Sequence, residues 1–103
     1  MNYLLIIQAK PMKNNKKFTL IGEAEFQAWV IADSIEAAQS RICSLLEQKK
    51  WMPTIENGYF ITEEQMGNLE ATEEKLFMEA LKNKGISIRM ISCARCLDEQ
   101  RCL

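Results

Sequence analysis

The sequence predicts an α+β domain of ferredoxin-like general type, in which a mainly antiparallel sheet carries two helices on one face. Segments with the alternating period of strands and segments with the 3.6 period of helices follow one another in the order β-β-α-β-α-β. The 103 residues suffice for one domain, and 48% of them are hydrophobic, which is enough to form a core. Right-handed crossovers would place both helices on the same face of a sheet whose chain doubles back.

The first half of the chain begins with two predicted strands. Residues 3–10 are apolar with β-branched content, and a loop from Pro11 to Lys17 separates them from a long strand over 18–32. We expect a β-bulge at Gly22 in this second strand. Its inward-facing side chains alternate along the strand and are Phe26, Ala28, Val30 and Ala32. Trp29 and Ile31 would then lie on the opposite face.

A helix is predicted over residues 34–50. The segment 33–36 has the acceptor and the third-position glutamate of a helix N-terminus. Apolar residues then follow the helical period, at Ile35, Ala38, Ile42, Leu45 and Leu46. Residues 51–61 contain Asn57-Gly58, the strongest short hairpin signal, so they predict either a small hairpin or one strand interrupted by a turn.

The second half of the chain predicts a short helical turn, a helix and a last strand. Thr62 and Gln65 have the spacing of a capping box. A helix over 72–84 would end at Gly85 in the left-handed conformation. Residues 86–91 alternate as a strand, which predicts a domain over 1–92 followed by a cysteine-containing tail over 93–103.

Composition argues against an enzyme and against several kinds of partner. The chain has no histidine, the commonest general base and metal ligand, and no glycine-rich phosphate loop or nucleophile elbow. We therefore expect no catalytic residues, no cofactor and no small-molecule substrate. The apolar run over 3–7 is shorter than a signal peptide or a membrane span requires. We expect a cytoplasmic protein that does not bind membranes.

Cysteines near the C-terminus predict one alternative function, a thiol site. Cys93 and Cys96 have the C-x-x-C spacing that supplies two zinc ligands from one turn, and Cys102 could supply a third. The same spacing occurs in redox motifs. The simpler interpretation is a tail with ordinary thiols.

A lysine-rich loop predicts a second alternative, weak nucleic-acid binding. Lys13, Lys16 and Lys17 follow Lys10 within eight residues, and such a loop can contact phosphates. The chain lacks the glycine-rich and aromatic motif of ribonucleoprotein-type domains. Lysines in this position also discourage strands from pairing edge to edge, which is the simpler interpretation.

The two halves of the chain carry opposite charge. The 13 basic and 14 acidic residues sum to −1, but residues 1–50 carry +2 and residues 51–103 carry −3. The acidic residues Glu70, Glu73 and Glu74 lie at or near the start of the second predicted helix, where the helix dipole favours them. An acidic face of this kind would also suit docking to a basic protein surface.

Large apolar residues outside the predicted core carry the main functional expectation. Trp29, Ile31, Trp51 and Tyr59 exceed what a two-layer core of this size must bury. Trp and Tyr are typical anchors of protein interfaces. The sequence therefore predicts a non-catalytic protein-binding module that acts stoichiometrically, as an adaptor, inhibitor or immunity-type protein. Trp29, Ile31, Trp51 and the acidic residues would contact another protein or a second copy.

Overall fold

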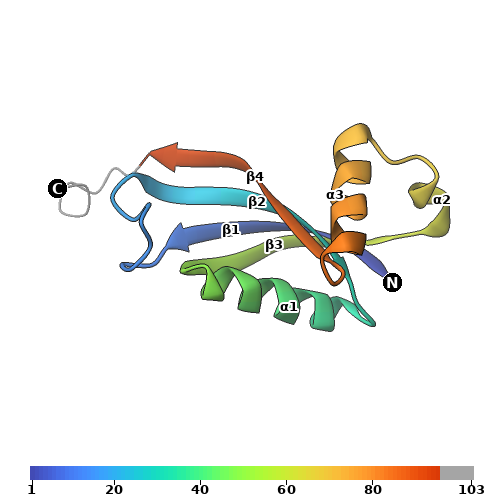
Figure 1. The fold of residues 1–103 in the computed structure, drawn as a ribbon, viewed down its shortest axis with the longest axis horizontal. Helices are drawn as coiled ribbons and strands as arrows, with labels where there is room; N and C mark the ends of the chain where they lie inside the picture. Colours follow the sequence, from blue (N-terminus) through green and yellow to red (C-terminus); the bar gives the residue numbers. More distant parts are fainter. Residues whose placement is uncertain (96–103) are drawn as a thin grey trace.

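A four-stranded antiparallel sheet with the strand order β3-β1-β2-β4 forms the centre of the fold (Figure 1). The computed structural model describes residues 1–95. Its elements are β1 (Asn2–Pro11), β2 (Ile21–Ile31), α1 (Ile35–Gln48), β3 (Trp51–Ile61), α2 (Glu63–Met66), α3 (Ala71–Lys82) and β4 (Ile86–Arg95). The predicted α+β class is confirmed.

Helix α1 covers one face of the sheet, mainly over β3. Its buried residues Ala38, Ile42 and Leu46 pack against alternate side chains of β1 and β2. These sheet residues are Tyr3, Leu5, Ile7, Ala9, Ala24, Phe26, Ala28 and Val30. The predicted inward-facing set of the second strand thus faces a core formed with α1.

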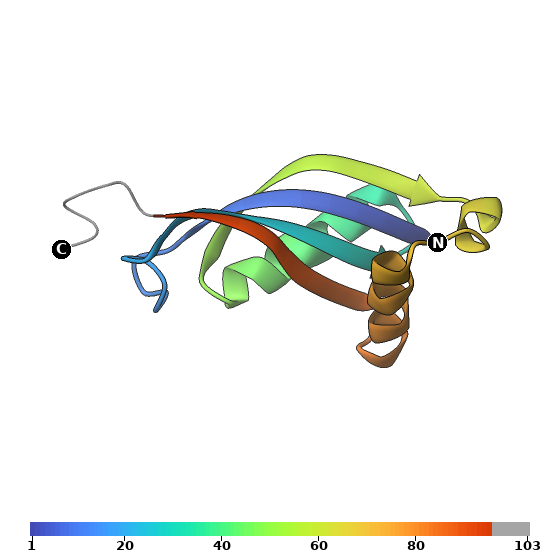
Figure 2. The same ribbon diagram turned by 90° about the horizontal axis from the view of Figure 1, so that it is seen from above.

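Helix α3 packs against the opposite face, near the end of the sheet where the N-terminus lies (Figure 2). Trp29 is the centre of this second cluster and is fully buried, with Leu4, Ile61, Leu76 and Ala80 around it. The Trp29 ring lies 5.3 Å from the Phe77 ring, and its Nε1–H donates to Asn2 Oδ1 at 3.0 Å. Both the apolar surface and the polar atom of Trp29 are therefore satisfied within the chain.

The prediction of two helices on one face is wrong, and the strand order does not confirm the ferredoxin-like arrangement. Strands β3 and β4 form opposite edges of the sheet and run in opposite directions. The handedness rule applies to crossovers between parallel strands, so it constrains the β2-α1-β3 connection only. The connection from β3 to β4 is free to pass over the other face, and α3 covers Trp29 there.

Several local predictions are confirmed. Gly22 is the extra residue where the β2–β4 register shifts between Ile21 and Glu23, as expected for a bulge. Thr62 and Gln65 form a capping box at the start of α2. Gly85 has a φ of +83°, the left-handed conformation that follows α3.

Residues 51–61 form one continuous strand rather than a hairpin. Asn57 and Gly58 pair with Ile6 and Leu5 of β1, and a register shift leaves Glu56 as the extra residue. A Cβ atom at Gly58 would lie 2.8 Å from a methyl carbon of Leu5 and 2.9 Å from one of Ile35. Glycine at this position therefore lets α1 approach the sheet closely, and it does not form a turn.

Strand β4 is longer than predicted and extends through Arg95. The first three residues of the predicted tail, from Cys93 to Arg95, thus belong to the sheet. Within residues 1–95, no helix has the length and apolar content needed to span a membrane.

Candidate functional site

Six exposed lysines gather at the end of the sheet that lies away from α3 (Figure 1). Three come from the loop between β1 and β2, one comes from the end of β1, and two come from the turn between α1 and β3. We call this surface the basic end, and it consists of Lys10, Lys13, Lys16, Lys17, Lys49 and Lys50. Residues 10–20 contain no acidic residue, so the loop contributes positive charge alone.

Asn15 ties the two lysine-bearing segments together. Its Nδ2 donates to the carbonyl oxygen of Lys50 at 3.0 Å and to that of Lys49 at 3.5 Å. Its Oδ1 accepts from the backbone N–H of Lys17 at 2.8 Å, which forms a local turn. The backbone N–H of Met12 adds a 2.8 Å bond to the Lys50 carbonyl. The spacing between the two groups of lysines is therefore held by polar contacts to the main chain.

The lysines border a shallow depression of about 380 Å³. Four lysines line it, Lys16, Lys17, Lys49 and Lys50, together with Asn14, Asn15 and Trp51. Ammonium groups act as strongly hydrated point charges without the planar fork of arginine. Trp51 is only 7% exposed and packs edge-on against Phe26, so a nucleobase has no free aromatic ring here on which to stack. The surface suits carboxylate or phosphate groups recognised by charge.

Six of the acidic residues lie at the other end of the molecule, on and around α2 and α3, namely Glu63, Glu64, Glu70, Glu73, Glu74 and Glu79. Glu63 and Glu64 lie in the first turn of α2, and Glu73 and Glu74 lie in the first turn of α3. Glu73 Oε1 accepts from the backbone N–H of Glu70 at 3.1 Å, so this pair caps α3. The molecule is 49 Å long, whereas charges are screened over about 8 Å at physiological salt. The two ends therefore present separate fields of opposite sign.

The apolar residues expected at an interface are placed differently from the prediction. Trp29 is 0% exposed beneath α3, and Trp51 is buried in the other cluster, so neither is available to a partner. Ile31 is half-buried and packs against the cluster beneath α3. The aromatic side chains that the structure does expose are Tyr59 and Phe60 of β3, each 51% accessible.

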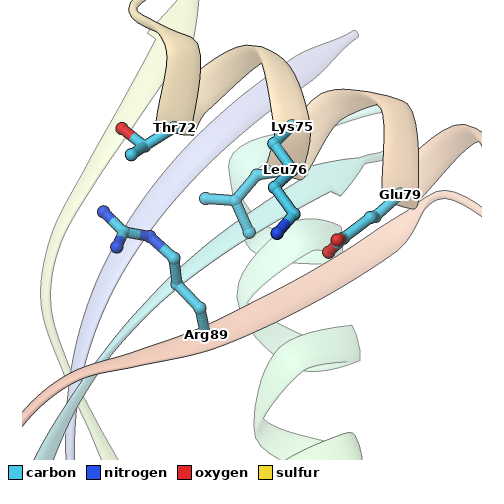
Figure 3. A pocket seen from close by; sticks show the side chains of 5 residues that line it. All are labelled: Thr72, Lys75, Leu76, Glu79 and Arg89. Atoms are coloured by element: carbon cyan, nitrogen blue, oxygen red, sulfur yellow. The ribbon is translucent and has the colours of Figure 1, made fainter.

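A hollow of about 210 Å³ between α3 and β4 is too small for an ordinary ligand pocket, which has a volume of roughly 300–1,000 Å³. Its side chains are Thr72, Lys75, Leu76, Glu79 and Arg89 (Figure 3). Arg89 Nε donates to Gln27 Oε1 at 2.8 Å, so the guanidinium is held on the sheet surface. The mixed charges do not single out one ligand, and we assign no site to this hollow.

The proposed thiol site falls largely outside the described residues. Cys93 is an exposed free thiol in β4, whereas Cys96 and Cys102 lie beyond residue 95. Cys43 in α1 is half-buried, and burial, with a smaller contribution from the Glu47 carboxylate, raises the pKa of its thiol. Within residues 1–95, no three or more cysteine or acidic side chains cluster closely enough to hold a metal ion.

Sequence reasoning found the lysine loop but missed Asn15 and the contribution of Lys49 and Lys50. Lys49 and Lys50 follow directly after α1, where positive charge interacts favourably with the helix dipole, so the sequence alone offers a structural reason for them. Their proximity to the loop follows from the pairing of Pro11 with Trp51 between β1 and β3. The strand order supplies that information, and a local pattern in the sequence does not.

No protein-family model matches the sequence, and neither a curated protein nor a solved structure is significantly similar to the chain.

Proposed function

We propose that the protein is a small non-catalytic binding module that docks through its basic end onto an acidic surface of another protein. The observation that supports this proposal is the preorganised cluster of six exposed lysines, drawn from two segments and joined by Asn15. A preorganised surface loses less conformational entropy on binding than a mobile one. Charges of one sign also steer a complementary partner and accelerate association.

The charge distribution of the whole chain favours a folded protein over a long nucleic acid. The acidic residues of α2 and α3 would repel a polyanion that extended along the molecule. A compact acidic patch on a folded protein would contact only the basic end and would not reach the acidic residues of α2 and α3. The residues that line the depression at the basic end also include no arginine and no exposed aromatic ring, which are the usual means of reading or stacking bases.

The test is affinity capture from a nuclease-treated extract of the native host, with two matched charge reversals. Lys16→Glu with Lys17→Glu alters the basic end, and Lys75→Glu with Lys82→Glu alters exposed lysines of α3. We expect a partner that the wild type and the α3 variant retain and the basic-end variant loses. Raising the salt concentration should release that partner, because screening weakens exposed charge pairs.

Two outcomes would contradict the proposal. One is a partner that both variants retain equally, because the lysines would then make no contribution to docking. The other is nucleic acid as the only molecule captured when nuclease treatment is omitted, since this would favour the nucleic-acid alternative. Circular dichroism of each variant confirms that a loss of binding is not a loss of fold.

A further inference from the structure

The edge of β3 carries a segment with the features of a self-pairing strand. β3 forms one border of the sheet, and Figure 2 shows no helix or strand beyond it along that border. Residues 57–60 are exposed and include the half-exposed rings of Tyr59 and Phe60. An edge strand presents unpaired N–H and C=O groups that another strand can complete.

The two halves of β3 differ in how they are protected against such pairing. The first half contains Pro53, which has no N–H to donate, and the bulge at Glu56, which carries a charge. The second half, residues 57–62, contains no proline and no charged residue. Pairing is therefore blocked in the first half and permitted in the second.

The opposite edge of the sheet also has an exposed stretch without proline or charge, residues 90–94, but a bulge at Ile91 interrupts it. β4 carries exposed positive charges at Arg89 and Arg95, and its register with β2 shifts between Glu25 and Phe26. Two copies of β4 would bring like charges together. The segment 57–62 is the more suitable edge for a two-fold axis, because such an axis places a segment against itself.

We propose that two copies of this chain pair through β3 in antiparallel fashion, with the two-fold axis at Tyr59, to form a continuous eight-stranded sheet. This register places Tyr59 opposite its own equivalent and Phe60 opposite Gly58 of the second copy. An aromatic ring over a cross-strand glycine covers backbone that the glycine leaves exposed. Glu56 lies opposite Thr62 of the second copy, so no like charges are directly opposed.

The dimer and the docking function have opposite salt dependences. Glu63 follows β3 after Thr62 and in this register lies beside Glu56 of the second copy, so dimerisation brings acidic groups of the two copies closer together. Salt should screen this repulsion and strengthen the dimer, whereas it should weaken docking at the basic end. Failure of one proposal therefore leaves the other testable.

The experiment is light scattering on purified protein, over a range of concentrations, with two variants at the proposed axis. Tyr59→Lys and Tyr59→Glu should each be monomeric, because like charges would meet across the axis. An equimolar mixture of the two variants should restore a dimer. Ile91→Lys, on the exposed opposite edge, is the matched control and should dimerise like the wild type.

The proposal is overturned if the wild type stays monomeric at every concentration. It is also overturned if both Tyr59 variants still dimerise, or if their mixture stays monomeric while each is folded by circular dichroism. If β3 pairs with a strand of another protein and not with itself, the purified wild type would stay monomeric at every concentration, which is the first of these outcomes.

Discussion

The basic and acidic ends of the molecule are held together by different forces. At the basic end, Asn15 and backbone groups join the lysine loop to the turn after α1 through hydrogen bonds to main-chain carbonyls. At the acidic end, α3 is held on the sheet by apolar contacts of Leu76 and Ala80 with Trp29. Comparing the contacts at the two ends shows which charged side chains support the fold and which remain available to bind a partner.

Part of the acidic charge has a structural role. Glu73 accepts a hydrogen bond from the backbone N–H of Glu70, the N-cap residue of α3, and Glu74 lies in the same first turn, where negative charge stabilises the helix dipole. The loop at the basic end is tied instead by Asn15 and by backbone groups. We therefore expect that substituting a basic-end lysine changes binding more than stability.

The largest expected effect is on the acidic end, from Trp29→Ala. The substitution empties the centre of the cluster beneath α3 and leaves Asn2 without its donor, so we expect a loss of about 3–5 kcal/mol in the free energy of unfolding. Denaturant unfolding measures this change. Tyr59→Ala, at a half-exposed aromatic, should cost less than half as much. Equal losses would show that α3 does not bury Trp29.

A smaller effect is expected at the basic end, from Asn15→Ala. The variant loses its bonds to the Lys49 and Lys50 carbonyls and to the Lys17 N–H, which should cost about 1–2 kcal/mol at this partly exposed position. Denaturant unfolding again provides the measurement. The exposed neighbour Asn14 provides the control, since Asn14→Ala should change stability by no more than about 0.5 kcal/mol. A neutral Asn15→Ala would mean that the two lysine segments are not tied together.

The smallest expected effect concerns the cap of α3. Glu73→Ala removes the acceptor for the Glu70 N–H and should lower stability by about 0.5–1 kcal/mol. Glu73→Gln keeps an oxygen acceptor and should recover part of that loss, which thermal unfolding can follow. If Glu73→Ala were as stable as the wild type, the capping role that separates the acidic end from the basic end would be excluded.

Much of the fold could be predicted from local patterns, because capping residues, helical stripes and strand alternation depend on neighbours in the chain. The bulge at Gly22, the capping box at Thr62 and the left-handed Gly85 are examples. The face covered by α3 depends instead on which edge β4 joins, and no local pattern encodes that choice.

The candidate site was predictable only in part for the same reason. The lysine loop is visible in the sequence, but its union with Lys49 and Lys50 requires that β3 pair with β1. The two tryptophans of the predicted interface are buried, because α3 covers the face of the sheet on which Trp29 lies and Trp51 packs in the other cluster. Once α3 covers that face, the surplus aromatic surface becomes a second core.

Docking through the basic end is tested most directly by nuclear magnetic resonance. Backbone amide signals are recorded while a short polyglutamate peptide is added as a carboxylate probe. We predict shifts confined to residues 10–20 and 47–51 that salt abolishes, with none in α2 or α3. Shifts of equal size in α2 and α3, or no salt-sensitive shift at the basic end, would contradict docking through the basic end.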